Sequence, residues 1–377
     1  MIYNNIILGG SIAGLSTALH INKGKTLILE KKKQTGQPVL CAEGIGSHVL
    51  KQLNIKPETE YVANTIQKIR ITFPNNKTKT IQLKHLKGYI LHRDKFEQYL
   101  ARECEKKGVT IRNNAKFLKY DQKQRHVIYD YGGIQYITKT NIVVDATGIQ
   151  ACVGKNIGMN LKLKKEDICT CVQKTIQDNN INDDVIQLYL GKQIAPGGYA
   201  WVFPKGNHIA NVGLGITKNQ NRLQYYMQNL LNYLSLKPEK TLREFRSCVP
   251  LSMPAEHIVK NNVLLVGDAA RFVNAATGAG IGYSYKSGQI AGECITQYNN
   301  GWSKTLQNYE EIMKQTLYPR LIHAYRMKQK LTHNENTMNR LYYKFLPIIM
   351  LHRVFPFIEK YAVNYSSLSE GASRRQS

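Results

Sequence analysis

The stretch Ile6-Ile7-Leu8-Gly9-Gly10-Ser11-Ile12-Ala13-Gly14 decides the fold of this 377-residue chain. Its three leading apolar residues are typical of a strand buried in a parallel sheet. The glycine-rich turn then opens a helix whose apolar residues recur at helical spacing as far as Gly24. Residues 26–29 form a second apolar strand, which stops at Glu30. The chain therefore begins with one β-α-β unit, which indicates an α/β fold.

The glycine turn has the form expected of a dinucleotide-binding site. Gly9 suits the tight turn after the strand, and Gly14 lets the helix pack closely on that strand. Ser11 stands at the middle position, where a small residue lets the backbone approach a pyrophosphate at the helix N-terminus. Glu30 is placed to hold a ribose hydroxyl. We therefore expect an adenine dinucleotide at Gly9, Ser11, Ala13, Gly14 and Glu30, the alternative being a turn whose glycines serve packing alone.

Two later segments also place a carboxylate directly after a buried strand. Residues 143–144 lead into the first, and residues 263–266 lead into the second. In the second, glycines open a helix whose first amides can face the pyrimidine end of a flavin, which is anionic when reduced. The alternative is a strand-to-helix loop with an N-capping Asp. The cofactor residues expected here are Asp145, Gly148, Gly267, Asp268, Gly278, Ala279, Gly280 and Ile281.

Charge is the unusual feature of the composition. The chain has 52 Lys and Arg against 26 Asp and Glu, a formal net charge of +26. Such a field favours polyanions, namely nucleic acid, anionic membrane or phosphorylated ligands. The sequence lacks zinc-finger spacing, an RNP-type strand and an isolated basic helix, so we expect no nucleic-acid partner. With 42% hydrophobic residues the chain can build a sizeable core, which excludes a disordered protein.

The cysteines and histidines predict neither a disulfide framework nor a metal site. Seven cysteines are scattered along the chain without a C-x-x-C pair, which fits a reducing compartment. Cys169 and Cys171 are interpreted as sheet residues, because two thiols alone rarely hold a metal. The ten histidines form no H-E-x-x-H pattern, so we expect no metal. With no signal-peptide pattern and no run of about 18 apolar residues, a cytoplasmic protein is expected.

Taken in order and spacing, the three glycine and carboxylate motifs resemble those of the flavoprotein hydroxylase–reductase superfamily. Within it the chain is most similar to the geranylgeranyl reductase family. The closer match rests on a Cys-containing loop at 38–45, an Arg-x-x-Phe helix start at 93–96 and a Tyr-x-Trp-x-Phe-Pro signature at 199–204. Residues 285–288 also continue the helix after the second flavin loop as members of the family do. The resemblance covers roughly residues 1–300.

The resemblance implies a Rossmann-like FAD-binding domain that is split by a mixed or antiparallel β-sheet substrate domain. The expected FAD domain comprises 1–65, 88–160 and 255–300, and the substrate domain comprises 66–87 and 161–254. A C-terminal helical region occupies 301–377.

The resemblance also implies roles for individual residues. Cys41 lies near the flavin, as a proton donor or a loop-positioning group, and Arg93 meets the FAD. Tyr199, Trp201 and Phe203 line a lipid pocket. On a strand the three alternate onto one face, which a packed core would also explain.

Four positions depart from the family pattern. Ser11 replaces a Gly, Arg271 stands where the family usually has Gly, Ala275 where it usually has Pro, and Lys155 where relatives often have Arg.

The function implied is FAD-dependent hydrogenation of geranylgeranyl double bonds in a prenyl lipid. The alternative is an FAD-dependent monooxygenase of an aromatic or isoprenoid substrate. A second nicotinamide-type glycine motif is missing from the sequence. The electron donor is therefore either NAD(P)H that docks transiently or an acidic ferredoxin-like protein, which a basic surface would suit.

The C-terminal segment 301–377 has 12 Lys and Arg against 5 Asp and Glu, interleaved with aromatic and apolar residues at 341–358. This pattern suits a helix lying on an anionic membrane surface. The alternative is a set of helices that cap the substrate domain and present a solvated basic face.

Overall fold

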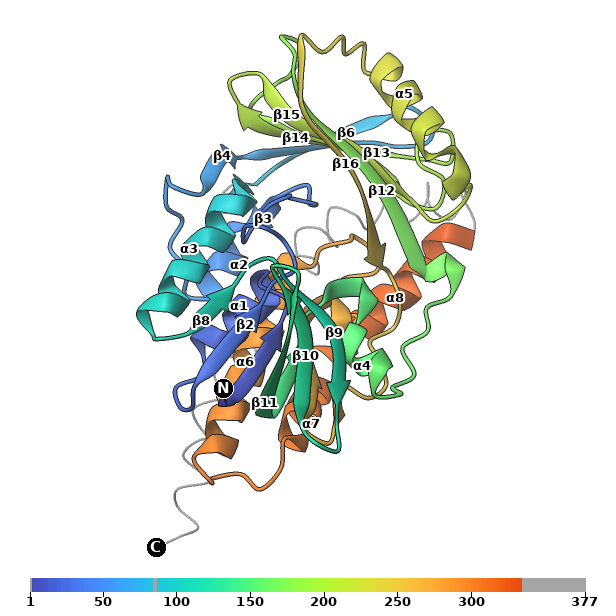
Figure 1. The fold of residues 1–377 in the computed structure, drawn as a ribbon. Coiled ribbons are helices and arrows are strands. Elements are labelled where there is room, and N and C mark those ends of the chain that lie inside the picture. Colours follow the sequence, from blue (N-terminus) through green and yellow to red (C-terminus); the bar gives the residue numbers. More distant parts are fainter. Residues whose placement is uncertain (1, 84–86, 334–377) are drawn as a thin grey trace, which may run out of the picture.

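The computed structural model describes residues 2–83 and 87–333, which build two large sheets with helices around one of them (Figure 1). The first sheet runs in the order β17-β18-β11-β1-β2-β8, and β10 and β9 extend it from β11. β1 pairs in parallel with both β2 and β11, as the β-α-β unit requires. Its strands are β1 (Ile2–Leu8), β2 (Thr26–Leu29), β8 (Thr110–Arg112), β9 (Ala115–Asp121), β10 (His126–Tyr131), β11 (Ile134–Asp145), β17 (Val259–Lys260) and β18 (Val263–Leu265).

The second sheet has seven strands in the order β16-β12-β15-β14-β13-β5-β6. Its pairs are antiparallel except β13 with β5, so the sheet is mixed. One face packs under α5 (Leu223–Tyr233), and the other looks toward the first sheet. Its strands are β5 (Lys68–Thr72), β6 (Thr78–Gln82), β12 (Ile168–Gln177), β13 (Val185–Leu190), β14 (Tyr199–Gly206), β15 (Ile209–Ile216) and β16 (Lys240–Pro250).

Short elements join the two sheets. A three-stranded sheet in the order β3-β7-β4 lies between them, and its strand β7 leads into α3 along the chain (Figure 1). Its strands are β3 (Gly44–Gly46), β4 (Val62–Ile66) and β7 (Gly88–Leu91). The helices are α1 (Ile12–Leu19), α2 (Ser47–Gln52), α3 (Arg93–Lys106), α4 (Cys152–Asn156), α6 (Ile281–Asn299), α7 (Gln307–Thr316) and α8 (Tyr318–His333).

The expected fold class is confirmed. The chain combines a mainly parallel sheet of the Rossmann-like type with a mixed β-sheet, and helices follow at the C-terminal end of the described chain. The apolar and basic stretch at 341–358 lies outside the described residues. Within the described ranges, no helix has the length and apolar character needed to cross a bilayer.

Helix α1 packs unusually closely against α6, at two glycines of α6. A Cβ atom on Gly288 would lie 2.3 Å from the carbonyl oxygen of Ala13, and one on Gly292 would lie 2.5 Å from that of Thr17. The Ser16 hydroxyl reinforces the crossing by donating a hydrogen bond to the Tyr285 carbonyl. This contact sets the position of α6 relative to the glycine turn before α1.

The crossing predicts that Gly288→Ala destabilises the protein. The added methyl group has no room against backbone atoms of α1, so we expect the free energy of unfolding to fall by about 1–3 kcal/mol. Urea unfolding followed by circular dichroism measures it. Gln297→Ala, at an exposed position of the same helix, serves as the control and should change the unfolding free energy by less than about 0.5 kcal/mol.

Candidate functional site

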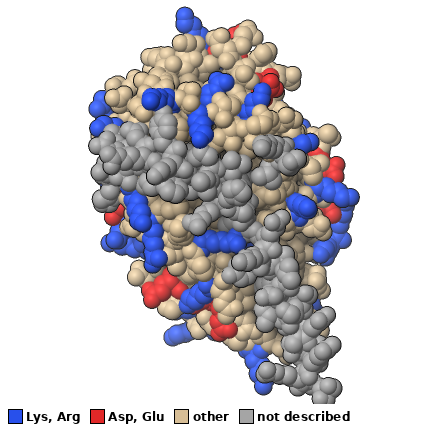
Figure 2. All heavy atoms as spheres, turned by 180° about the vertical axis from the view of Figure 1, so that it is seen from behind, with Lys and Arg blue, Asp and Glu red and all other residues tan. Residues whose placement is uncertain are grey.

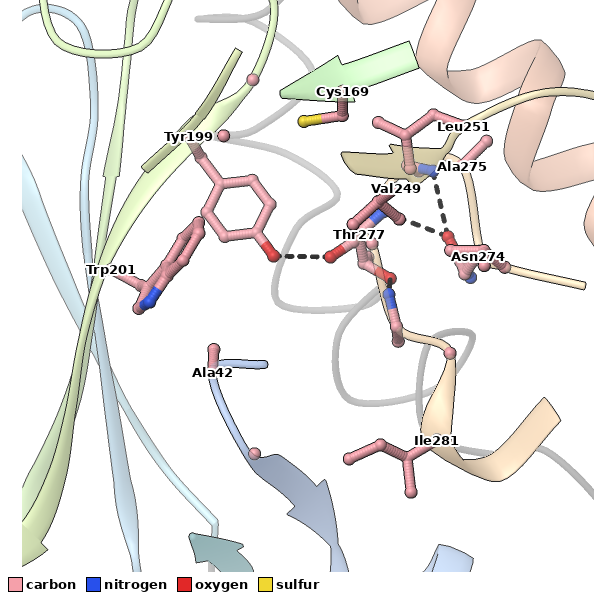
Figure 3. Close-up of a pocket in the computed structure, with 18 of the residues that line it drawn as sticks. Ala42, Cys169, Tyr199, Trp201, Val249, Leu251, Asn274, Ala275, Thr277 and Ile281 are labelled. Atoms are coloured by element: carbon pink, nitrogen blue, oxygen red, sulfur yellow. Dashed lines mark hydrogen bonds between the residues drawn. The ribbon is translucent and has the colours of Figure 1, made fainter. Parts of the chain in front are cut away.

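A cavity of about 1590 Å³ lies between the seven-stranded sheet and the helices and loops of the first sheet (Figure 3). The sheet side is mostly apolar, with residues from β5, β12, β13, β14 and β16. The opposite side is formed by the Cys41 loop, the start of α3, the loop before α6 and one face of α8. A large, mainly apolar cavity with a few polar groups at one end is typical of a site for a cofactor and an apolar substrate.

The aromatic residues of β14 form one wall of this cavity. Tyr199, Trp201 and Phe203 all border it, as their alternation on one strand predicted. Trp201 fits over Gly213 of the neighbouring strand, where a Cβ atom would lie 2.7 Å from its ring. The Tyr199 hydroxyl donates a hydrogen bond to the Thr277 carbonyl and so joins this wall to the loop before α6 (Figure 3).

A hydrogen-bonded chain connects Trp201 to the Cys41 loop through Gln173. The Trp201 indole N–H donates to Gln173 Oε1 at 3.0 Å, and Gln173 Nε2 donates to the Cys41 carbonyl at 3.1 Å. The Gln173 side chain is fully buried. One amide on β12 therefore positions both the aromatic wall and the loop opposite it.

The Cys41 loop is also held by the buried carboxylate of Glu43. Its Oε1 accepts the backbone N–H of Arg93, the first residue of α3, at 2.9 Å. Its Oε2 accepts hydrogen bonds from Lys205 on β14 and from Asn211 on β15, and Arg243 on β16 approaches it at 3.5 Å. Glu43 is only 1% exposed and has a φ of 74°. This left-handed conformation is unfavourable for a side chain with a Cβ, and the surrounding hydrogen bonds hold it in place.

Arg93 lies at the junction of the glycine turn and the Cys41 loop. Its guanidinium group pairs with Glu97 at 2.8 Å and donates to the Ser11 hydroxyl, which itself donates to Glu97. Burial works to lower the pKa of Arg93, but Glu97 and the adjacent Cys41 sulfur outweigh it and raise that pKa above its ordinary value. Arg93 thus stays a cation at the edge of the cavity.

The serine in the glycine turn has a clear structural role. Ser11 is the N-cap of α1, yet its hydroxyl contacts Glu97 and makes no capping hydrogen bond. The first amides of α1 are therefore left without a side-chain cap. A helix N-terminus of this kind binds phosphate well.

The expected cofactor residues divide into two sets. Those that border the cavity are Arg93, Asp268, Gly278, Ala279, Gly280 and Ile281, together with Cys41. Burial raises the pKa of Asp268, which Arg93 and Arg271 partly oppose. The others lie behind or beside the cavity lining: Gly9, Ser11, Ala13, Gly14, Glu30, Asp145, Gly148 and Gly267.

Glu30 and Asp145 use their carboxylates to shape backbone turns. Glu30 accepts the backbone N–H groups of Gly10 and Lys32 at 2.7 and 2.9 Å. Asp145 is fully buried, and its two oxygens accept backbone N–H groups at Thr147, Val153 and Gly154 as well as the Thr147 hydroxyl. Asp145 therefore fixes the loop after β11 and the start of α4, and it does not point into the cavity.

Of the departures from the family pattern, Arg271 is explained by the contacts of its buried side chain. This residue has a φ of 65°, a conformation that favours glycine, and it is 2% exposed. Its guanidinium donates to the carbonyls of Ile149, Asp268 and Leu161, which ties the Asp268 loop to the segment after β11. Ala275 is buried in the cavity wall, and Lys155 is exposed in the last turn of α4.

The residues not predicted from the sequence are polar groups in or next to the cavity wall: Glu43, which borders the cavity, and Glu97, Gln173, Lys205 and Asn211, which bond to the residues that form the wall. The sequence could have indicated the role of Glu97, because it lies four residues after Arg93 on a helix, where opposite charges pair. The sequence pattern for Glu43 and Gln173 is weaker: each is a polar residue within an otherwise apolar stretch, which suggests a buried hydrogen-bonding group.

The chain is similar to known proteins over most of its length. A family model described as the geranylgeranyl reductase catalytic domain matches residues 167–248. A digeranylgeranylglycerophospholipid reductase of Methanocaldococcus jannaschii is 35% identical over 83% of this chain and 82% of its own length. One of Methanocella arvoryzae is 32% identical, over 88% of this chain and 87% of its own length.

Solved structures agree with this relationship. A geranylgeranyl bacteriochlorophyll reductase-like protein of Thermoplasma acidophilum matches with a TM-score of 0.85 and 27% identity, over 90% of each chain. A myxobacterial chondrochloren halogenase, a variant of the FAD-dependent halogenases, matches with a TM-score of 0.70 at 16% identity, which shows the shared fold alone. Together these comparisons imply a flavin cofactor.

The two hydrogen bonds that Gln173 makes, with the Trp201 indole and with the Cys41 carbonyl, predict that Gln173→Met destabilises the protein. This substitution keeps the side-chain length and removes both hydrogen bonds. The Trp201 N–H and the Cys41 carbonyl would then be buried without partners, so the free energy of unfolding should fall by about 1–3 kcal/mol. Urea unfolding checks this value. Gln177→Met, at the half-buried end of the same strand, is the control, and an equal loss there would contradict a specific role for the two hydrogen bonds.

His48, on α2 at the cavity, predicts a pH dependence of stability. Burial lowers the pKa of His48 from 6.5 to about 4. As the pH falls from 6.5 toward 4, the unfolded chain takes up a proton there while the folded chain does not, so stability falls. Unfolding at several pH values should show that His48→Gln loses less stability than the wild type over this interval. Identical slopes for the two proteins would contradict the prediction.

Proposed function

Since the chain belongs to the geranylgeranyl reductase family, we propose that it hydrogenates the double bonds of geranylgeranyl chains carried by a glycerophospholipid. The observation that carries the proposal is the cavity itself. An aromatic wall from β14 faces an apolar space of about 1590 Å³, and the far end of that space meets glycine loops at the start of α6. An isoprenoid chain offers only apolar surface for recognition, so a cavity of this kind suits it.

The residues around the glycine loops fit FAD as the cofactor. A Cβ on Gly9 would lie 2.2 Å from the Ala146 carbonyl oxygen, and one on Gly14 would lie 1.9 Å from that of Gly9, so this turn admits no side chains at these positions. Gly278 and Gly280, by contrast, line the cavity, and a Cβ on either would have its nearest neighbour at ordinary contact distance, 3.8 and 3.6 Å away. Both α1 and α6 begin without a side-chain cap, which leaves amides for anionic groups.

We assign the parts of FAD to these residues as follows. The pyrophosphate is held at the N-terminus of α1 by the turn from Gly9 to Gly14, and the adenosine ribose by Glu30. Arg93 and Asp268 hold the ribityl and phosphate region, and the Gly278–Ile281 amides face the pyrimidine edge of the ring. Asp145, Gly148 and Gly267 support this arrangement by fixing the loops behind it.

The bound cofactor supplies a hydride for one carbon of the alkene. The protein's own residues orient the chain against the aromatic wall and exclude water from the cavity. The Cys41 loop lies beside Arg93 at the junction of the two regions. We propose that Cys41 is close to the flavin and that Gln173 and Glu43 set its position.

The electron donor is proposed to come from outside the chain, either as NAD(P)H or as an acidic ferredoxin-like protein. Figure 2 shows Lys and Arg side chains spread over the back of the molecule, with fewer Asp and Glu among them. This surface favours acidic partners through electrostatic steering. The same charge suits a peripheral position on an anionic membrane surface, where the lipid substrate would be found.

The proposed reaction is tested with the reduced holoenzyme under anaerobic conditions. Addition of a digeranylgeranylglycerophospholipid should reoxidise the flavin and yield lipid that is heavier by two hydrogen atoms for each double bond reduced. The saturated lipid is the control and should leave the flavin reduced. A flavin that stays reduced with both lipids, or a product that contains added oxygen when air is admitted, would overturn the proposal, the second outcome in favour of a monooxygenase.

A pair of variants connects this activity to the cavity. Trp201→Ala removes much of the aromatic wall and should lower kcat/KM for the prenyl lipid roughly tenfold or more, because a buried aromatic side chain contributes about 1.5–3 kcal/mol. Trp302→Ala changes a tryptophan that is 79% exposed and should leave kcat/KM unchanged.

A further inference from the structure

Two thiols lie side by side in the wall of the cavity. Cys169 and Cys171 are on one face of β12, their sulfur atoms are 3.8 Å apart, and both border the cavity. They are 6% and 8% exposed, so the cavity is their route to solvent. The two sulfur atoms pack over Gly215 of the neighbouring strand, where a Cβ would lie 2.8 Å from the Cys169 sulfur and 3.1 Å from the Cys171 sulfur, so only glycine leaves room for both thiols. Figure 3 shows Cys169 close to the Tyr199 wall.

The geometry argues against a disulfide between these thiols. A disulfide needs its sulfur atoms about 2.05 Å apart and its Cα atoms within about 6.8 Å. Residues i and i+2 of an extended strand are about 6.6 Å apart, at the upper limit of that range. β12 is also held in register by β15 and β16 on its two sides, which opposes a backbone shift.

The surroundings argue equally against a reactive thiolate or a structural metal. The hydrogen bond with Cys169 and burial raise the pKa of the Cys171 thiol well above its ordinary value, which disfavours a Cys171 thiolate. A structural zinc site requires four ligands. In the described part of the chain, no group of three or more His, Cys, Asp and Glu side chains is placed to hold a metal ion.

The ligand class that remains is a thiophilic centre that needs only two sulfur atoms. We propose that Cys169 and Cys171 form a dithiol site for monosubstituted trivalent arsenicals, R–As(OH)₂, with the substituent R in the apolar cavity beside Trp201. Trivalent arsenic is trigonal pyramidal and holds two bonded sulfur atoms somewhat closer together than the 3.8 Å observed, a difference that small rotations of the two side chains about χ1 can close.

The binding reaction is a condensation without a change of oxidation state. Two S–H bonds and two As–O bonds break, two As–S bonds form, and the two thiol protons leave with the two hydroxyl groups as water. Because the two thiol protons leave in the water that forms, no external base, oxidant or reductant is consumed. The substituent R would lie in the cavity against the aromatic wall.

The experiment titrates the full-length protein with phenylarsine oxide, which hydrates to the required form, and follows it by native mass spectrometry and tryptophan fluorescence. We expect one phenylarsenic unit per chain, with the loss of two hydrogen atoms and two titratable thiols. The adduct should be released by 2,3-dimercaptopropanol and retained in an excess of the monothiol 2-mercaptoethanol. Release by the monothiol would overturn a two-thiol chelate without the need for any variant.

Cysteine-to-serine variants test which thiols bind the arsenical. Cys169→Ser and Cys171→Ser should each weaken binding roughly 100-fold or more, because loss of one thiol removes the advantage of a second intramolecular bond. Cys248→Ser changes an exposed cysteine at the same cavity; it is the matched control and should bind as the wild type does.

Circular dichroism checks that each variant is folded. Undiminished binding in both Cys169→Ser and Cys171→Ser, or loss of binding in Cys248→Ser, would overturn the assignment. Neither outcome bears on the proposed reductase reaction, which is measured separately.

Discussion

The buried carboxylate of Glu43 is the interaction on which the arrangement of the two sheets around the cavity depends. A carboxylate that is 1% exposed requires partners for both oxygens, because an unpaired buried charge is very unfavourable. Those partners come from α3 on one side and from three strands of the seven-stranded sheet on the other. Because these partners come from both sides of the cavity, the Glu43 carboxylate ties the start of α3 to the seven-stranded sheet and so constrains the geometry of the cavity between them.

Several polar groups at the sheet side of the site are satisfied by protein partners. Gln173 and Glu43 have hydrogen bonds within the protein, and neither the Trp201 indole nor the Cys41 carbonyl needs water. An apolar chain beside the aromatic wall therefore leaves these groups paired. At the other end, the uncapped helix starts and Arg93 provide donors where an anionic cofactor is proposed to bind. Under the proposed function, the separation of these two environments lets one cavity hold both a prenyl chain and a dinucleotide.

Much of the fold was predictable, because its signals are local. The apolar run before Gly9, the positive-φ glycine and the helix that follows are dictated by short-range sterics and periodicity. The helix expected near 93 and the strand that carries Tyr199 are found as expected, and the three aromatic residues share the cavity. For Asp145, the position after a buried strand predicts a cofactor contact, and this stays a prediction. The structure adds that its carboxylate oxygens accept hydrogen bonds from amides of the loop that follows, a role that the sequence pattern did not indicate.

The sequence by itself therefore determined the β-α-β unit, the glycine turns, the aromatic wall and the family resemblance, since each depends on residues within a few positions of one another. Only the tertiary structure decided the partners of the buried polar groups. Glu43 meets Lys205 and Asn211, which are more than 160 residues away in the chain. Likewise, strand pairing places the Cys169 and Cys171 thiols against Gly215, whose lack of a side chain leaves room for them. Such contacts follow from the register of the strands and from the packing of one sheet on the other, and neither can be deduced from a local sequence pattern.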